Sequence, residues 1–411
     1  MGAQELNFGE WVIILSATGY ASFLGLILFF WRPRFLPPEP RGDPVPLNLT
    51  VVIAARNEAE NIGACLQSLI QETGISEIRV VDDHSTDQTE DVVRQVQVKD
   101  ARIKLIRAPA LPPGWFGKSH ALEFGAHDIS TNYLLFTDAD VVFGSEIIAT
   151  AIRRMHTAQL DHLGGHFFVD CRSVAEEICA PVLLLSSGLA LFGTASKLGA
   201  ATGAFNLLRT EFYRDHGGHV PIRSEIVDDV ALARHLKAAG GRSDFVALDD
   251  FVKVRLFVGF RGFVTSVSRS AVSFLKLGGL AVGCLTACAM GLALLPFICL
   301  VLGILLTLAA PTTTAAVVAG SLALLPYFLG FLAVRLSRRF HNGRSLCQWG
   351  YPVALFVLAA AVFGAALAPV RRRSLVWRGR QYSLNQEQQL LPTASQVMVG
   401  PLIYGNRDED N

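Results

Sequence analysis

The sequence predicts an α/β domain with a mostly parallel, doubly wound sheet that faces the cytoplasm, with transmembrane α-helices at both ends of the chain. Strand-like and helix-like segments alternate over residues 48–254, which is typical of parallel sheets. Acidic motifs follow several of the strands, and uncharged apolar runs lie on both sides of the domain. Ligands of such sheets bind beyond the carboxyl ends of the strands, so the acidic motifs mark the expected site.

The alternation begins with Leu49–Ala55, a continuous aliphatic run as expected of a strand buried on both faces. The following segment places Ile62, Cys65, Leu66 and Leu69 on one side of a helix. In all, helices are predicted over 58–73, 86–98 and 117–126, and further strands over 78–81, 103–106 and 133–137. No repeat with a period of about 20–50 residues is evident, which argues against a solenoid.

Membrane spans are indicated by composition, because hydrophobic residues make up 51% of the 411-residue chain and charged residues only 17%. The uncharged run over 11–31 is long enough to cross a bilayer as one helix. It lacks a basic segment before it and a small-residue cleavage site after it, so we interpret it as a retained anchor. Arg32 and Arg34 follow it, which places the next domain in the cytoplasm.

A second apolar region, residues 278–370, is predicted to hold about three membrane helices. No charge lies between Lys276 and Arg335, and a further apolar run covers 349–370. Two spans before Arg335 followed by one more would place Arg371–Arg373 outside, against the positive-inside rule. Either the last segment re-enters or the earlier block crosses three times, and both remain open. The chain is thus expected to be a multi-pass protein of the inner (plasma) membrane.

Three other segments complete the predicted organisation. Residues 37–47 form a proline-rich linker, and residues 371–411 form a basic and then polar tail. Residues 255–277 mix arginines with phenylalanines, as in an interfacial amphipathic helix, although a cytoplasmic flank of the next span is the alternative. Seven scattered cysteines without a CxxC pair argue against a disulfide framework or structural zinc. The net charge of +1 gives no sign of nucleic acid, and none is predicted as a partner.

The sharpest chemical motif is Asp138-Ala139-Asp140, directly after a strand-like run. Two carboxylates separated by one residue can share a divalent cation with a diphosphate, and hard oxygen ligands suit Mg²⁺ or Mn²⁺. Such a cation stabilises charge on a leaving nucleoside diphosphate. An acidic turn is the alternative for an isolated motif, but the position after an apolar strand, in order with the other motifs, favours a metal site.

Two motifs fit the donor of such a reaction. Asp82 and Asp83 follow the second strand, where a carboxylate can accept hydrogen bonds from a nucleobase. Asp83 is the preferred base contact, because one of the two aspartates is also explained as part of a helix cap. Lys118 stands at the start of a helix, where it can reach a phosphate together with exposed backbone N–H groups. A solvated surface lysine is the alternative.

The acceptor side is represented by Asp228 and Asp229, which open another helix-like segment. An aspartate there can remove a proton from an acceptor hydroxyl as a general base. Acidic residues also favour helix N-termini for electrostatic reasons, so position alone leaves both interpretations open. The uncharged run over 178–193 is too short to span a bilayer comfortably, and it is either a core helix or a surface that lies against lipid.

Taken together, these motifs resemble the bacterial membrane-bound family 2 glycosyltransferases, which have the Rossmann-like GT-A fold. The similarity is greatest to the hopene-associated and carotenoid-lipid branch, and it covers about residues 49–277. It rests on the motifs Ala55-Arg56-Asn57-Glu58, Val81-Asp82-Asp83, Leu111-Pro112-Pro113-Gly114-Trp115, Gly117-Lys118, Thr137-Asp138-Ala139-Asp140, Gly203-Ala204-Phe205-Asn206-Leu207, His216-Gly217-Gly218-His219, Val227-Asp228-Asp229-Val230 and Trp377-Arg378-Gly379-Arg380-Gln381-Tyr382.

The resemblance implies inverting, metal-dependent transfer from a nucleotide-diphosphate sugar, most simply a UDP-sugar. The implied roles are donor binding for Glu58, Asp83, Lys118 and Asp138, metal binding for Asp138 and Asp140, and general base for Asp229. The usual Glu-Asp pair at the base is Asp228-Asp229 here, which preserves the charge.

One departure from the processive members of the family bears on the acceptor. The Gln-x-x-Arg-Trp motif of processive polysaccharide synthases is absent, and the corresponding region offers Val267-Ser268-Arg269-Ser270. The sequence therefore predicts transfer of one sugar to a hydroxyl of a hydrophobic lipid acceptor at the membrane. The alternatives are a processive polysaccharide synthase and a catalytically silent membrane scaffold. Retention of Asp138, Asp140 and Asp229 disfavours the scaffold.

Overall fold

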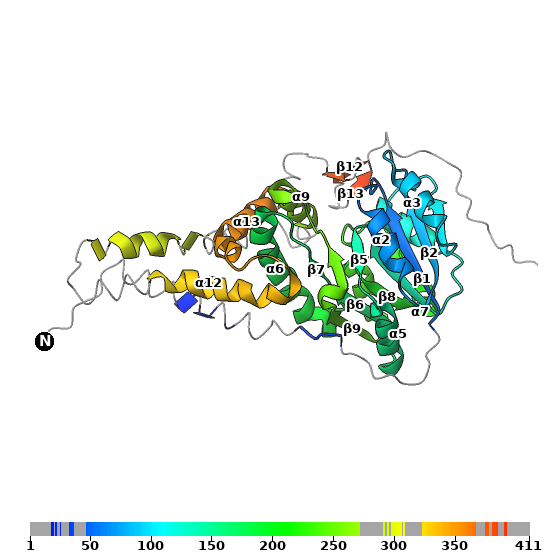
Figure 1. Ribbon diagram of the computed structural model, residues 1–411, viewed down its shortest axis with the longest axis horizontal. Coiled ribbons are helices and arrows are strands. Elements are labelled where there is room, and N and C mark those ends of the chain that lie inside the picture. Colours follow the sequence, from blue (N-terminus) through cyan, green and yellow to red (C-terminus); the bar gives the residue numbers. More distant parts are fainter. Residues whose placement is uncertain are drawn as a thin grey trace, which may run out of the picture.

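In the computed structural model, a seven-stranded sheet in the order β3-β2-β1-β4-β8-β6-β9 organises residues 49–247 (Figure 1). β8 is antiparallel to both of its neighbours, whereas all other neighbouring strands are parallel. The predicted mostly parallel sheet is therefore confirmed. Its strands are β1 (Leu49–Ala55), β2 (Ile75–Asp82), β3 (Ile103–Arg107), β4 (Tyr133–Asp138), β6 (His162–His166), β8 (Asn206–Arg209) and β9 (Ser243–Ala247).

The structure describes residues 47–271 and 323–366, together with 18–19, 21–22, 25, 33–36, 291, 294–295, 297–305, 307–308, 375–377, 380–384 and 390–392. The predicted span over 11–31, the linker over 37–47 and the predicted spans between 278 and 322 lie wholly or largely outside these residues.

Helices cover both faces of the sheet because alternate strand residues point to opposite sides. Val51 and Ile53 of β1 pack towards one layer, and Val52 packs towards the other. The first layer contains α2 (Ile62–Ile70), α3 (Thr89–Gln97) and α5 (Ile147–Thr157). The second contains α4 (Gly117–Ala126), α7 (Thr210–Asp215) and α8 (Asp228–Ala238).

The first predicted helix begins four residues later than expected, at Ile62, because residues 57–61 form a loop with its own hydrogen bonds. Asn57 has a left-handed backbone with φ of 54°. Its backbone N–H donates to Ser85 Oγ at 3.0 Å, and its side chain accepts the N–H of Thr86 at 2.8 Å. These bonds tie the loop after β1 to the loop after β2.

A smaller sheet lies beside the main one, in the order β5-β10-β7. It consists of β5 (Val141–Phe143), β7 (Phe168–Val169) and β10 (Val252–Val254). A third small sheet comes from the C-terminal part, with β11 (Leu375–Trp377), β12 (Arg380–Leu384) and β13 (Leu390–Pro392). Short 3-10 helices are η1 (Val220–Ile222), η2 (Asp249–Phe251), η4 (Leu336–Phe340) and η5 (Cys347–Gly350).

Three largely apolar helices, α6 (Val174–Leu198), α12 (Leu325–Arg335) and α13 (Tyr351–Ala366), and the amphipathic helix α9 (Gly259–Ala271) extend away from the sheet (Figure 1). The uncharged run predicted over 178–193 lies inside α6, and its residues Cys179, Ala180 and Leu184 are buried in the core that these helices share. The core interpretation is thus correct for this part of α6. In α9, Phe263 and Val267 face the same core.

Within the described residues, one helical stretch, Cys347–Gly364, is long and apolar enough to cross a membrane. It overlaps the predicted run over 349–370. A shorter helical stretch, residues 297–305, is not among the segments long enough by this criterion, but it exposes the apolar side chains of Ile298, Val301 and Ile304. It contacts α12 through Phe297, whose ring centroid lies 6.0 Å from that of Tyr327.

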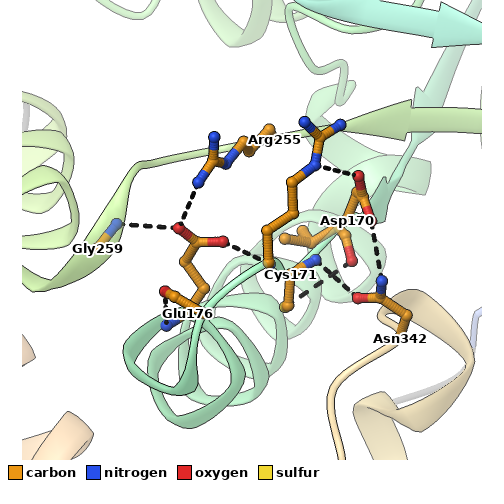
Figure 2. A network of polar contacts seen from close by, with 9 residues as sticks. Asp170, Cys171, Glu176, Arg255, Gly259 and Asn342 are labelled. Atoms are coloured by element: carbon orange, nitrogen blue, oxygen red, sulfur yellow. Dashed lines mark hydrogen bonds and ion pairs between the residues drawn. The ribbon is translucent and has the colours of Figure 1, made fainter.

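A buried polar network joins the apolar helices to the α/β domain (Figure 2). The carboxylate of Glu176, only 1% exposed, accepts hydrogen bonds from Arg255 at 3.1 Å, Gly259 N–H at 3.0 Å and Arg172 N–H at 2.6 Å. Burial alone would raise the pKa of Glu176, but these hydrogen bonds lower it below its ordinary value. The network fixes the start of α6 against the segment between β10 and α9.

The loop after η4 is attached to the same region. Asn342 donates to the Asp170 carboxylate at 2.8 Å and accepts the N–H of Cys171 at 2.7 Å (Figure 2). Because Asp170 follows β7 of the smaller sheet, the helices on either side of this loop, α12 and α13, have a fixed attachment to the α/β domain.

Candidate active site

The acidic motifs meet at one edge of the sheet because their strands end at the same level. Ala55 is paired with Asp82 across β1 and β2, and Ala54 is paired with Asp138 across β1 and β4. The loops that carry Glu58, Asp83 and Asp140 follow directly. Sequence order and parallel pairing therefore bring together side chains that are up to 82 residues apart.

Lys118, the second residue of α4, connects the end of β4 to the start of α8. Its Nζ lies 2.8 Å from Asp138 Oδ1 and 3.3 Å from Asp228 Oδ1. Burial alone would lower the pKa of Lys118, but the charges of Asp138, Asp228 and Asp229 outweigh it and raise the pKa well above its ordinary value. The amine is therefore held as a cation among three carboxylates.

Asp229 occupies the first turn of α8, beside this cation. Its Oδ1 accepts the N–H of Val230 at 2.7 Å. Burial, and after it the negative charge of Asp228, raise the pKa of Asp229 to about 7, against the opposing effect of Lys118. A carboxyl group with such a pKa changes protonation near neutral pH, which is the range in which a general base is most effective.

Cys65 of α2 shows how the carboxylates on the other side of the site are placed. Burial raises the pKa of the Cys65 thiol, and the charges of Asp140, Asp138 and Glu58 raise it further. The thiol also lies 3.8 Å from the backbone carbonyl oxygen of Asp138, so α2 packs against the end of β4. Glu58 is held in place by its neighbours, because its Oε2 accepts a hydrogen bond from Asn61 at 2.9 Å and its N–H donates to Thr89 at 2.8 Å.

The site has oxygen ligands suitable for a divalent cation but no complete protein cage. No group of three or more His, Cys, Asp or Glu side chains is arranged to hold a metal ion anywhere in the described part of the chain. Asp138 and Asp140 offer two hard carboxylates, and the side chain of Asp138 is 39% exposed. Mg²⁺ usually takes one or two carboxylates and completes its shell with substrate phosphates and water. The residues present fit a cation that binds together with a diphosphate.

Asp82 and Asp83 differ sharply in their surroundings. The carboxylate of Asp82 accepts the N–H of Ser85 at 3.2 Å, so it shapes the loop after β2. The carboxylate of Asp83 instead accepts two hydrogen bonds from Arg380, at 2.7 and 3.0 Å. Arg56 also donates to the backbone carbonyl of Asp83. Sequence reasoning missed the contact with Arg380, whose only signal was its place in the Trp377–Tyr382 motif.

Gly203 and the buried residues before α8 support Lys118 and its partners. The N–H of Asp138 donates to the carbonyl of Gly203 at 2.9 Å, and a Cβ at Gly203 would lie 2.3 Å from Asp138 Oδ2.

His219, which precedes α8, is held by two hydrogen bonds. Its Nδ1 lies 2.7 Å from the Tyr213 hydroxyl, and its backbone N–H donates to Glu123 at 2.7 Å. Burial, assisted by the charge of Lys118, lowers the pKa of His219 to about 3, so its imidazole is neutral and structural.

Comparison with known proteins adds an independent finding. Residues 46–255 match the family described as "Glycosyltransferase like family 2". The chain is 26% identical over 362 residues to the 4,4'-diaponeurosporenoate glycosyltransferase of Staphylococcus aureus strain bovine RF122 / ET3-1, covering 83% of this chain and 90% of that protein. Its identity to the protein of the same description from strain USA300 is 28% over 359 residues, covering 83% and 89%.

Among solved structures, the chain is similar to the mannosyltransferase PcManGT from Pyrobaculum calidifontis, solved in complex with GDP-Man and Mn²⁺. The TM-score is 0.50 at 18% sequence identity, covering 86% of this chain and 98% of that one. At this identity the likeness concerns the fold alone, which is the GT-A-like α/β fold with a mostly parallel central sheet.

Proposed function

This chain belongs to the glycosyltransferases of the family 2 type, and on that premise we propose that it transfers one sugar from a nucleotide-diphosphate sugar, UDP-linked, to a hydroxyl of a lipid-type acceptor. The observation that carries the proposal is the cluster at the sheet edge, where Lys118 lies between Asp138 and Asp228 and next to Asp229. This cluster combines a cation for phosphates with a carboxyl group suited to accept a proton.

On the donor side, Asp83 contacts the nucleobase and Lys118 contacts the donor phosphates. Glu58, in the loop after β1, also contributes to donor binding. Asp138 and Asp140 would hold Mg²⁺ or Mn²⁺, which when bound offsets charge on the departing diphosphate. Before donor binding, Lys118 neutralises the carboxylate of Asp138. The positive charge of Lys118 thereby reduces the electrostatic repulsion between the acidic edge of the sheet and an anionic donor.

On the acceptor side, Asp229 removes the hydroxyl proton as the acceptor oxygen attacks the anomeric carbon of the sugar. The bond from that carbon to the diphosphate oxygen breaks in the same displacement, and the diphosphate leaves with the bonding electrons. A single displacement of this kind inverts the anomeric configuration. The raised pKa of Asp229, about 7, suits this proton transfer.

The lipid character of the acceptor is supported by the relatives and by the apolar helices. The relatives are named for 4,4'-diaponeurosporenoate, and the exposed side chains of Phe328, Leu332 and Val353 lie on α12 and α13. A surface with many large exposed apolar side chains typically faces a membrane or a protein partner. We place the enzyme in the inner membrane as a multi-pass protein with its α/β domain in the cytoplasm.

A carboxylate acceptor is the second candidate, because the name of the relatives' acceptor is that of a carboxylate. A carboxylate oxygen is already ionised at neutral pH and needs no base. The two candidates are therefore separated by the dependence of transfer on Asp229.

The proposed function is tested with the detergent-purified full chain, Mn²⁺, a panel of UDP-, GDP- and dTDP-sugars and a bacterial lipid extract. We expect release of UDP that requires both the lipid and one particular sugar, and that Asp229→Asn abolishes. Lipid-dependent release that persists in Asp229→Asn would favour a carboxylate acceptor. Absence of release with UDP-, GDP- and dTDP-sugars alike would contradict glycosyl transfer and favour a silent scaffold.

A further inference from the structure

Asp83 and Arg380 form a buried, two-pronged ion pair between the first β-α units and the C-terminal segment. Arg380 Nη1 lies 2.7 Å from Asp83 Oδ2, and Nη2 lies 3.0 Å from Oδ1. The side chains are only 6% and 3% exposed. The two residues are 297 positions apart in the sequence, and Figure 1 shows β12, which begins at Arg380, beside the α/β domain.

This geometry fixes the carboxylate more strictly than a single contact would. A guanidinium that binds both oxygens sets the plane of the carboxylate as well as its position. An ionised carboxylate has about four lone-pair sites, of which Arg380 takes two. The remaining sites can still accept an N–H from a ligand, in a direction that Arg380 determines.

A third residue lies close to this pair. His120 of α4 is 7% exposed, and the charges of Asp83 and Arg380 both act on it. Burial is the main reason that the pKa of His120 is lowered to about 4. Its Nδ1 is buried and has no hydrogen-bond partner among the described residues. A buried polar atom of this kind usually has a partner, and a bound ligand or an ordered water molecule would supply one.

We propose that Arg380 is a positioning residue for the nucleoside end of the donor site, where it orients the carboxylate of Asp83 towards the base. The proposal rests on the proposed function, in which Asp83 contacts the base. The C-terminal segment then forms part of the donor site, although the family match ends at residue 255.

The chemistry predicts which bases are selected. An oriented carboxylate accepts a hydrogen bond from the N3–H of uracil, whereas the N3 of cytosine is itself an acceptor and is repelled. A carboxylate that has lost its orientation discriminates less between the two, because it can turn away from an unsuitable partner. Arg380 thus contributes to base selectivity without touching the sugar or the acceptor.

The test is the affinity of the full chain, purified in detergent with Mn²⁺, for UDP and for CDP by titration calorimetry. We expect Arg380→Ala to weaken UDP binding about tenfold or more and to bring the UDP and CDP affinities closer together. Arg380→Lys keeps the positive charge but loses the two-pronged guanidinium. Its UDP affinity should lie between those of the unaltered protein and Arg380→Ala. Arg94→Ala is the matched control, because Arg94 is an exposed arginine of the same domain and its loss should change neither affinity.

A second measurement separates positioning from mere attachment of the C-terminal segment. If Arg380 acts through Asp83, the double variant Asp83→Asn with Arg380→Ala should bind UDP no more weakly than Asp83→Asn alone, because the effects of coupled residues do not add. Additive losses would overturn the proposal. So would unchanged or tighter UDP binding by Arg380→Ala, the latter meaning that Arg380 competes with the base. If the unaltered protein binds no nucleotide, the proposed function itself fails, which is a different result.

Discussion

The amine of Lys118 lies 2.8 Å from the carboxylate of Asp138, so the start of α4 is joined to the end of β4 by an ion pair at the sheet edge. The same amine lies 3.3 Å from Asp228 at the start of α8. The donor side and the acceptor side of the candidate site therefore share one cation. Because each group sits beside an opposite charge, the charge state of the whole cluster depends on Lys118.

Lys118→Ala should leave Asp138, Asp228 and Asp229 without their cation. Removing one partner of a buried ion pair typically costs about 3–5 kcal/mol, and the partial exposure of Asp138 places this case at the lower end. We expect a lower unfolding temperature, a raised KM for the donor and a large loss of turnover. Lys104→Ala on β3, where the side chain is exposed, is the control. A variant with an unchanged donor KM would refute the phosphate role of Lys118.

The pH dependence of transfer should follow Asp229. Its ionised form is the base, and its pKa is raised to about 7, so kcat/KM should fall about tenfold per pH unit below that pH. Asp228→Asn removes a negative charge that raises the pKa of Asp229, so the acid limb should move to lower pH. A pH profile for both proteins checks this. An acid limb that stays in place would show that another group controls the rate.

Gly203→Ala should damage the site without altering any charge. The new Cβ would lie 2.3 Å from Asp138 Oδ2 and 3.1 Å from Lys118 Nζ, so the carboxylate must move. Displacement of a reacting group by about 1 Å can cost about a hundredfold in rate. Gly262→Ala is the control, since its Cβ would meet nothing closer than 3.4 Å. Full activity of Gly203→Ala would mean that the position of Asp138 is not critical.

The proposed sugar transfer should require a divalent cation, and substitution of Asp140 should change that requirement. Treatment with EDTA should stop transfer, and added Mn²⁺ or Mg²⁺ should restore it. Asp140→Asn weakens a hard oxygen ligand and should raise the Mn²⁺ concentration needed for half-maximal activity by about tenfold or more. Asp91→Asn, on the exposed side of α3, should leave the Mn²⁺ requirement unchanged. Activity that survives EDTA would contradict a metal role for Asp138 and Asp140.

Much of the fold could be predicted because its signals are local. Leu49–Ala55 is a strand and Gly117–Ala126 a helix with the predicted bounds, since an aliphatic run and a helical period are visible within a few residues. The helix predicted from residue 58 begins at Ile62 because the side chain of Asn57 binds Thr86 in another loop. That bond depends on tertiary contacts, and a single sequence does not display them.

The candidate site was predictable to the extent that strand order implies proximity. Parallel strands place their C-terminal ends together, so the convergence of Asp82 and Asp138 followed from the alternation of elements. The pairing of Asp83 with Arg380 did not, because the two residues are 297 positions apart and nothing in the sequence between them indicates where the C-terminal segment lies. The placement of Lys118 between two carboxylates, rather than in solvent, likewise required the structure.

Transfer of a single sugar to a lipid is tested most directly by the mass of the lipid product. The detergent-purified chain is incubated with the sugar donor that it turns over, Mn²⁺ and lipid extract, and the organic phase is analysed by mass spectrometry. We expect one new lipid species, heavier than its acceptor by a single sugar residue, and its absence with Asp229→Asn. A ladder of products with increasing numbers of sugars would contradict single transfer and indicate a processive synthase, and donor turnover with no glycosylated lipid would contradict a lipid acceptor.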